Sequence, residues 1–178
     1  PTEHNMADLS IERYRAASYS RELSDKVFRG CARIAEGGFW AGGKPPYGFN
    51  RMLVDEQRNP VQMLKAGQRK GIQNQRVVLI PGDKQHVAIV RRIFRLFSLD
   101  KNAAPRIADT LNCDGVPSPG GRKWTSSSIY SILKNELYMG TMVYNKTSQR
   151  LRSASKRNPK ETWIRKKHAF KGLVDEKT

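Results

Sequence analysis

The stretch "KWTSSSIYSILKN", residues 123–135, places hydrogen-bonding side chains at helical spacing. With Ile129 facing a core, four polar side chains project to the opposite, exposed side: Ser127, Tyr130, Ser131 and Lys134. A helix that only had to be stable would favour alanine, leucine and glutamate at exposed positions. Short hydroxyl groups instead suit close approach to a polar surface, where they donate and accept hydrogen bonds. The stretch therefore predicts a helix that contacts a hydrogen-bonding partner.

The start of this helix adds groups that attract anions. Thr125 or Ser126 is the expected N-cap, and the free N–H groups of a first helical turn attract phosphate. Arg122 and Lys123 place positive charge directly before it. Serine capping followed by a surface without a partner is the alternative, but capping explains only one serine.

Charge is the strongest compositional signal. The chain has 33 lysines and arginines against 16 acidic residues, which gives a net charge of +17. Such a balance implies a polyanionic partner, either nucleic acid or an anionic membrane surface. No apolar run approaches the ~18 residues of a membrane span, and the N-terminus lacks the apolar region of a signal peptide. Because short hydroxyls on a helix also suit the major groove, we expect duplex DNA as the partner and no membrane.

Residues that could hold a metal or a cofactor are not grouped. Cys31 and Cys113 lack the paired spacing of a metal site or a disulfide framework, which indicates reduced thiols in the cytoplasm. The histidines, His4, His86 and His168, have no ligand-like neighbours. The sequence therefore predicts no metal and no cofactor.

Residues 8–36 contain no proline and one glycine, which predicts one long helix. Its apolar residues form a narrow stripe: Leu9, Ala16, Leu23, Val27 and Ile34. Such a stripe suits packing against one partner helix, in this chain or in another. Self-association through this helix is therefore one expectation.

The stretch "EGGFWAGGKPPYGFN" ends that helix. Its glycines allow close backbone approach to another surface, and its two prolines hold the chain extended. Gly42, Gly43 and Lys44 lie in it, with Arg33 and Arg51 on either side. The segment predicts a linker that follows a phosphate backbone or a narrow groove, or else a plain interdomain linker.

The remaining chain predicts a hairpin, three helices and a last strand. The runs "YGFNRMLV" and "QRVVLI" form the hairpin, with a long mobile connection over residues 55–74. Asp83 is the expected N-cap of a helix over residues 84–99. Its core face is Val87, Val90, Ile93, Phe94 and Phe97. Its other side carries Arg91, Arg92 and Arg95, either solvated or against phosphate.

A short helix "APRIADTLN" precedes the serine-rich helix, and together they suggest a helix-turn-helix-like unit. The strand "TMVYNK" ends at Lys146, and the basic residues 147–171 suggest a disordered or partner-ordered arm. The expected fold class is mainly α with a small β component.

Four motifs in order, "GKPPYGF", "IVRRIFRLF", "IADTLNCDGVPSPGGRKW" and "SSIYSILKNELYMGTMVYNK", resemble the recombinase domain of the large serine recombinases. These are site-specific DNA integrases and transposon resolvases. The resemblance covers about residues 20–146. It implies a connector helix over residues 1–40, a DNA-binding domain over 41–146, and a basic tail over 147–178. In the family this tail leads toward a zinc-ribbon region, which is absent here because no cysteine follows Cys113.

The resemblance also implies a cytoplasmic protein, encoded by a bacterium or a mobile element, that recognises an attachment or resolution half-site. Nothing in this sequence resembles the family's catalytic serine site, so no catalytic residue is expected. Ser10, Ser18, Ser20 and Ser24 all lie on the predicted connector helix. The family's reaction is serine-linked strand cleavage, subunit rotation and religation without a metal. The expected DNA contacts are Arg33, Gly42, Gly43, Lys44, Arg51, Arg122, Lys123, Thr125, Ser126, Ser127, Tyr130, Ser131, Lys134 and Lys146.

Three other functions compete with this one. A stand-alone DNA-binding regulator would use the same surfaces. An RNA-binding module is disfavoured, because no aromatic-studded strand is visible. A metal-dependent nuclease is disfavoured further, because the acidic residues are scattered.

Overall fold

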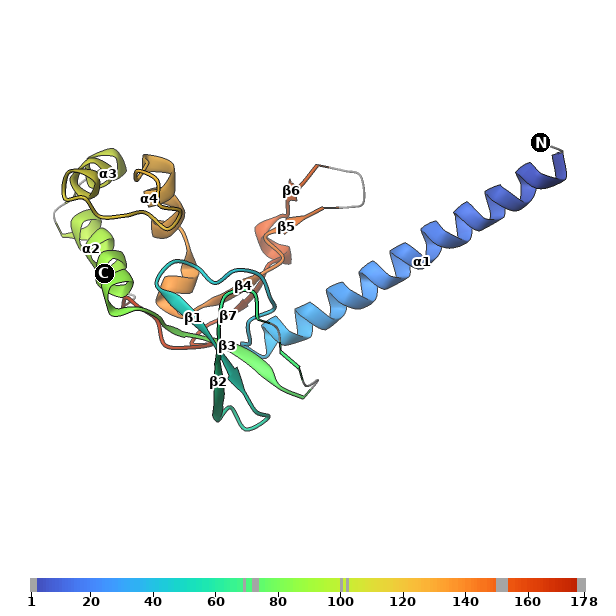
Figure 1. The fold of residues 1–178 in the computed structure, drawn as a ribbon, viewed down its shortest axis with the longest axis horizontal. Coiled ribbons are helices and arrows are strands. Elements are labelled where there is room, and N and C mark those ends of the chain that lie inside the picture. Colours follow the sequence, from blue (N-terminus) through green and yellow to red (C-terminus); the bar gives the residue numbers. More distant parts are fainter. Residues whose placement is uncertain are drawn as a thin grey trace.

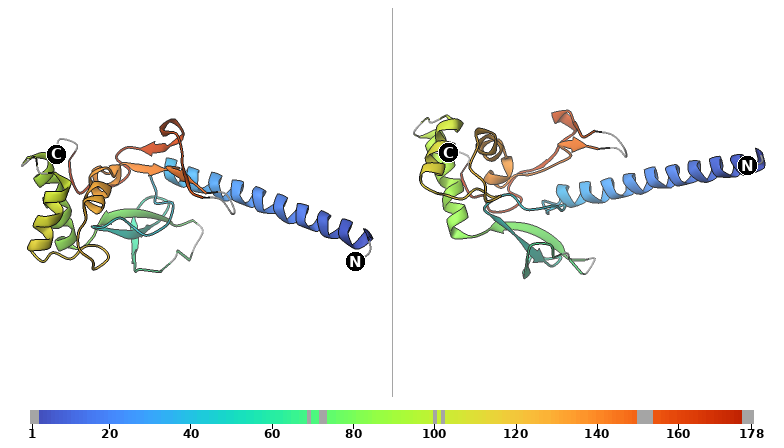
Figure 2. Two further views of the ribbon diagram at one scale, coloured as in Figure 1. Left: turned by 90° about the horizontal axis from the view of Figure 1, so that it is seen from above. Right: turned by 45° about the horizontal axis from the view of Figure 1, so that its top comes forward.

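A long helix extends away from the rest of the molecule like a rod (Figures 1 and 2). The computed structural model describes residues 3–68, 70–71, 74–99, 101, 103–149 and 154–175. Helix α1 runs over Glu3–Glu36, so the predicted helix is confirmed and begins earlier than expected. Leu9, Leu23 and Val27 on its apolar stripe are exposed. Within the described residues, this stripe meets no partner helix.

Among the residues that the structure describes, it is the last turns of α1 that touch the body of the molecule. They pack on a small antiparallel sheet of β4 (Met142–Tyr144) and β7 (Ile164–Lys166). The rings of Phe28 and Tyr144 lie 6.1 Å apart, and Ala35 is fully buried. Burial, together with Cys31, raises the pKa of the Tyr144 hydroxyl. The rod is therefore anchored at one end.

A three-stranded antiparallel sheet follows, in the order β2-β1-β3. Strand β1 (Phe49–Val54) pairs with β3 (Arg76–Pro81), which confirms the predicted hairpin. The connection was expected to be mobile, but it contains strand β2 (Pro60–Leu64), paired with the other edge of β1. Only Leu64 of β2 is buried, so backbone pairing rather than an apolar run defines this strand.

Three helices form the other half of the body. Asp83 caps α2 (Lys84–Ser98) by accepting a 2.7 Å hydrogen bond from the Gln85 N–H, as predicted. Helices α3 (Ala104–Cys113) and α4 (Ser126–Leu133) also match the expected segments. The prediction of Phe97 as a core residue is wrong, because its side chain is 46% exposed. Phe97 lies on the apolar face by angle, but the last turn of α2 extends past the core.

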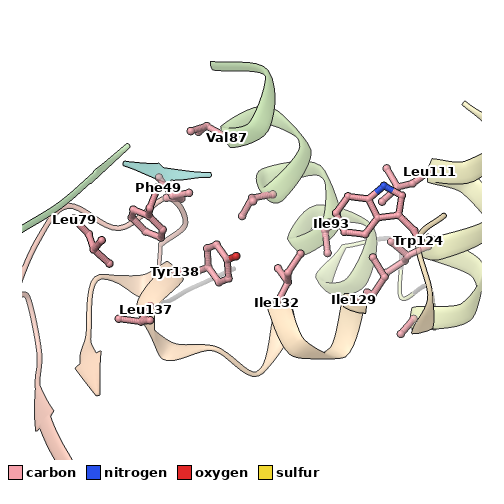
Figure 3. Packing of buried hydrophobic residues seen from close by; sticks show 14 of the residues in the cluster. Phe49, Leu79, Val87, Ile93, Leu111, Trp124, Ile129, Ile132, Leu137 and Tyr138 are labelled. Carbon is pink, nitrogen blue, oxygen red and sulfur yellow. The ribbon is translucent and has the colours of Figure 1, made fainter. Parts of the chain in front are cut away.

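Tyr138 connects the sheet with the helices. It lies in η1 (Glu136–Met139), between Phe49 on one side and Ile132 on the other (Figure 3). Its ring centroid is 5.7 Å from that of Phe49 and 5.9 Å from that of Phe94. Burial raises the pKa of its hydroxyl. The helices and small antiparallel sheets around this residue confirm the α+β class.

The C-terminal segment belongs to the fold, so the expectation of a disordered or partner-ordered arm is wrong for its described residues. It forms β5 (Thr147–Ser148), β6 (Lys156–Arg157), η2 (Lys160–Thr162) and β7. Trp163, Ala169 and Leu173 are buried. The Leu173 N–H donates to the Tyr138 carbonyl at 2.8 Å. These buried residues are widely spaced, so no periodic pattern marked them in the sequence.

Candidate nucleic-acid interface

The first turn of α4 is fixed by a reciprocal cap. Thr125 is the N-cap, and its side-chain oxygen accepts a 3.2 Å hydrogen bond from the Ser128 N–H. The Thr125 N–H donates in turn to the Ser128 hydroxyl at 3.0 Å. This pair closes a capping box, which explains one of the three serines. Ser126 and Ser127 take no part in this capping box.

Asn112 of α3 positions the residue directly before this cap. Its side-chain oxygen accepts from the Trp124 N–H at 2.7 Å, and its amide donates to the Trp124 carbonyl at 2.9 Å. The Trp124 indole N–H donates to the Val116 carbonyl at 3.0 Å, and the ring is 2% exposed. Helix α3 therefore sets where α4 begins. No local sequence pattern marks Asn112 for this role, because its partner lies twelve residues away across a loop.

The predicted polar side of α4 is exposed. Ser127, Tyr130, Ser131 and Lys134 all lie on the surface, while Ile129 and Ile132 are buried. The Lys134 ammonium lies 5.1 Å from the Tyr130 ring centroid. The Ser131 hydroxyl donates to the Ser127 carbonyl at 2.8 Å, so its oxygen remains available as an acceptor.

Two cations stand at the entrance to α4. Arg122 and Lys123 are both exposed, directly before buried Trp124. Within the described part of the chain, neither side chain forms an ion pair. Their charges, with the first-turn N–H groups of α4, make this end of the helix electropositive.

The glycine-rich linker is attached to the three-stranded sheet. The Trp40 N–H donates to the Val77 carbonyl at 2.6 Å, and the Trp40 indole donates to the Gly43 carbonyl at 3.2 Å. The guanidinium of Arg58 lies 4.5 Å from the Phe39 ring centroid and donates to the Gly37 carbonyl. The linker therefore has a defined path over the sheet.

A hollow of about 880 Å³ lies between this linker and the sheet. The predicted residues Gly42, Gly43, Lys44 and Arg51 line it, and the structure adds two cations, Lys70 and Arg76. The Arg51 guanidinium donates to the Lys65 carbonyl at 2.7 Å. No local sequence pattern marks Lys70 and Arg76 as part of this hollow, because their position depends on strand pairing.

The other predicted residues lie elsewhere. Arg33 is exposed in the last turn of α1, and Lys146 lies beside Trp163 in the C-terminal part. Two of the three arginines on α2 make intramolecular contacts. Arg91 donates to the Leu173 carbonyl at 2.9 Å, and Arg92 forms a 2.5 Å ion pair with Asp114.

The structure also bears on two other classes of partner. Among the described residues, no helix has the length and hydrophobicity needed to cross a bilayer. The same residues contain no group of three or more histidine, cysteine, aspartate or glutamate side chains placed to hold a metal ion.

Comparison with known proteins assigns the class. The Recombinase family model matches residues 84–178, which include α2, α3, α4 and the whole C-terminal segment. The match spans more than half of the chain. The chain therefore belongs to the recombinase family, in agreement with its resemblance to the recombinase domain of serine recombinases. No solved structure matches the chain.

Proposed function

We propose that this chain binds duplex DNA in a sequence-specific manner and positions a serine recombinase at an attachment or resolution half-site. One observation carries the proposal: α4 presents an exposed polar face, and hydrogen bonds fix the position of its N-terminus. Arg122 and Lys123 are exposed just before that N-terminus. A helix of this kind places its first residues against base edges in the major groove. Helices α3 and α4 then act as a helix-turn-helix-like unit.

The linker makes the second contact in this proposal. Gly42 and Gly43 are exposed, and apart from their chain neighbours no described residue lies within 4 Å of a Cβ built on either. Lys44 and Arg51 stand beside them. A backbone without side chains, flanked by cations, can approach a minor groove closely. Residues 41–146 would then be the core of the DNA-binding domain.

Helix α1 has a separate role as the connector, over residues 1–40. Its exposed stripe of Leu9, Leu23 and Val27 suits a helix of a second copy. In this proposal, the family's reaction is DNA cleavage and religation through a serine. This chain contributes by positioning the recombinase on the DNA.

The main alternative is a DNA-binding regulator without recombination. It requires the same DNA contacts, so binding measurements do not separate the two. The coding sequence upstream of this segment separates the two functions. A serine recombinase catalytic domain there would support recombination, and its absence would support the regulator.

Binding-site selection from random duplexes, followed by substitution, tests the DNA contacts. Arg122→Gln should weaken binding to every duplex and lower the salt slope by about 1, since one phosphate contact is lost. Tyr130→Ala should leave the slope unchanged and weaken only the selected site, by about 1–3 kcal/mol. Tyr14→Ala, an exposed tyrosine on α1, is the matched control and should change neither quantity.

Two outcomes would contradict the proposal. If selection enriches no sequence, the chain is not a specific DNA-binding protein. If Tyr130→Ala weakens selected and random duplexes equally, then α4 does not read bases. The hollow beside the linker would then be the next candidate for the main contact.

A further inference from the structure

Three cations surround one tryptophan in the C-terminal segment. Lys146, Arg157 and Arg165 place their charged groups 5.6, 5.4 and 4.9 Å from the Trp163 ring centroid. Lys146 lies between β4 and β5, Arg157 in β6 and Arg165 in β7. We call these four residues the Trp163 cluster. Only the tertiary fold brings them together.

The ring at the centre of the cluster is held in a fixed orientation. The Trp163 indole N–H donates to the Asn158 carbonyl at 3.0 Å. The Asn158 amide donates to the Asn145 side-chain oxygen at 2.7 Å, and the Asn145 amide donates to the Thr162 carbonyl at 2.9 Å. Trp163 itself is only 9% exposed. The cations are therefore gathered around a rigid, buried platform before any partner binds.

The positive charge of the cluster is only partly compensated. Glu136 forms a 3.2 Å ion pair with Arg165. Lys146 and Arg157 have no carboxylate at ion-pair distance among the residues that the structure describes. Each cation is attracted to the ring face, but the three like charges repel one another. Burial, and then Arg165 and Arg157, lower the pKa of Lys146, although Glu136 opposes them.

The surrounding sequence extends this charge. Residues 154–175 contain seven lysines and arginines against two acidic residues. A small anion would neutralise only the charges of the cluster. A polyanion can also form ion pairs with the lysines and arginines around it. Arginine and lysine beside each other suit the oxygens of a phosphodiester.

We infer that the Trp163 cluster binds a phosphodiester group of the DNA backbone. This contact is separate from α4 and from the linker, and the inference depends on the proposed DNA-binding function. Phosphate contacts fix the orientation of a protein on the duplex without reading its sequence. The cluster would thus orient the domain while α4 reads the bases.

Salt-dependent binding of the full chain to a random duplex tests the inference. Arg157→Gln and Lys146→Gln should each lower the salt slope by about 0.9. The binding constant varies as the salt concentration raised to about −0.9 for each phosphate contact. At about 150 mM salt, the loss of one contact therefore weakens binding roughly fivefold. Arg157→Lys keeps the charge and should keep the slope. Lys101→Asn is the control: it removes one exposed charge in the α2–α3 loop, and asparagine tolerates its φ of 49°.

The slope decides the result, and melting temperatures check that each variant folds. If Arg157→Gln and Lys146→Gln both keep the wild-type slope, the cluster is a packing feature and the inference is wrong. If Arg157→Gln does not fold, Lys146→Gln decides alone, since Lys146 donates no hydrogen bond to another described residue. A wild-type chain with no salt-dependent DNA binding would instead refute the proposed function, and the inference with it.

Discussion

Tyr47 packs edge-on against Trp124, with ring centroids 5.9 Å apart and ring planes at 75°. Tyr47 directly follows the two prolines of the glycine-rich linker, and Trp124 directly precedes the N-cap of α4. The Tyr47 ring also lies 4.6 Å from that of His86 in α2. The two parts proposed to contact DNA therefore share one aromatic contact, so the position of the linker and the start of α4 are coupled.

This coupling is measurable in a double-mutant cycle. Tyr47→Leu and Trp124→Leu should show an interaction energy of about 0.5–1.5 kcal/mol in the free energy of unfolding, as expected for an aromatic pair. Denaturant unfolding of the single and double variants gives this value. Tyr47→Leu combined with Leu9→Ala, on the exposed part of α1, should be additive. A Tyr47–Trp124 interaction energy near zero would show that the rings are merely adjacent.

Gly140 should tolerate no side chain. Its φ is 82°, and a Cβ would lie 2.5 Å from the Phe170 carbonyl oxygen. Gly140→Ala should therefore lower the free energy of unfolding by about 3 kcal/mol or more, through strain and displacement of the C-terminal segment. Gly120→Ala is the matched control, because a Cβ there meets no atom of the described residues within 4 Å apart from its chain neighbours. Similar unfolding midpoints for the two variants would contradict this account of how the segment docks.

Gly43 tests the linker contact without disturbing the fold. Its φ is 85° and the space around it is open, so Gly43→Asn adds a side chain that the protein itself can accommodate. The added side chain should obstruct close approach to DNA and weaken binding about tenfold, equivalent to about 1.4 kcal/mol. The melting temperature should change little. Unchanged affinity would show that the linker does not face the duplex.

Tyr138 predicts how stability responds to alkali. Burial raises its pKa above the ordinary value of 10.0, so the folded state keeps the proton that the unfolded state loses. Its contribution to stability is complete below pH about 10 and declines above it, by up to about 1.4 kcal/mol per pH unit. Burial also raises the pKa of Tyr47 and Tyr144, which act in the same direction.

Tyr138→Phe isolates this effect. Urea unfolding from pH 8 to pH 11 should show a smaller alkaline loss of stability for the variant than for the wild type. The comparison concerns the slope with pH, so any change in stability at neutral pH does not affect it. Equal slopes would mean that Tyr138 ionises equally in both states.

Local sequence patterns predicted the helices and some of their ends. Asp83 was identifiable as a cap, and Thr125 as one of two candidates with Ser126, because a cap needs only a short polar side chain and neighbouring N–H groups. The polar side of α4 was predictable because helical periodicity places Ile129 inward and Tyr130 outward. The pairing of β1 with β3 followed from their β-branched and apolar residues.

Only the tertiary structure showed the features that depend on contacts between residues distant in sequence. Strand β2 exists through backbone pairing with β1, and the C-terminal segment packs through isolated residues such as Trp163 and Leu173. The bonds from Asn112 to Trp124, and the three cations around Trp163, join residues from separate elements. Sequence periodicity indicates which side of a single helix or strand is buried. These sites depend instead on which helices and strands meet, and the packing of the whole chain determines that.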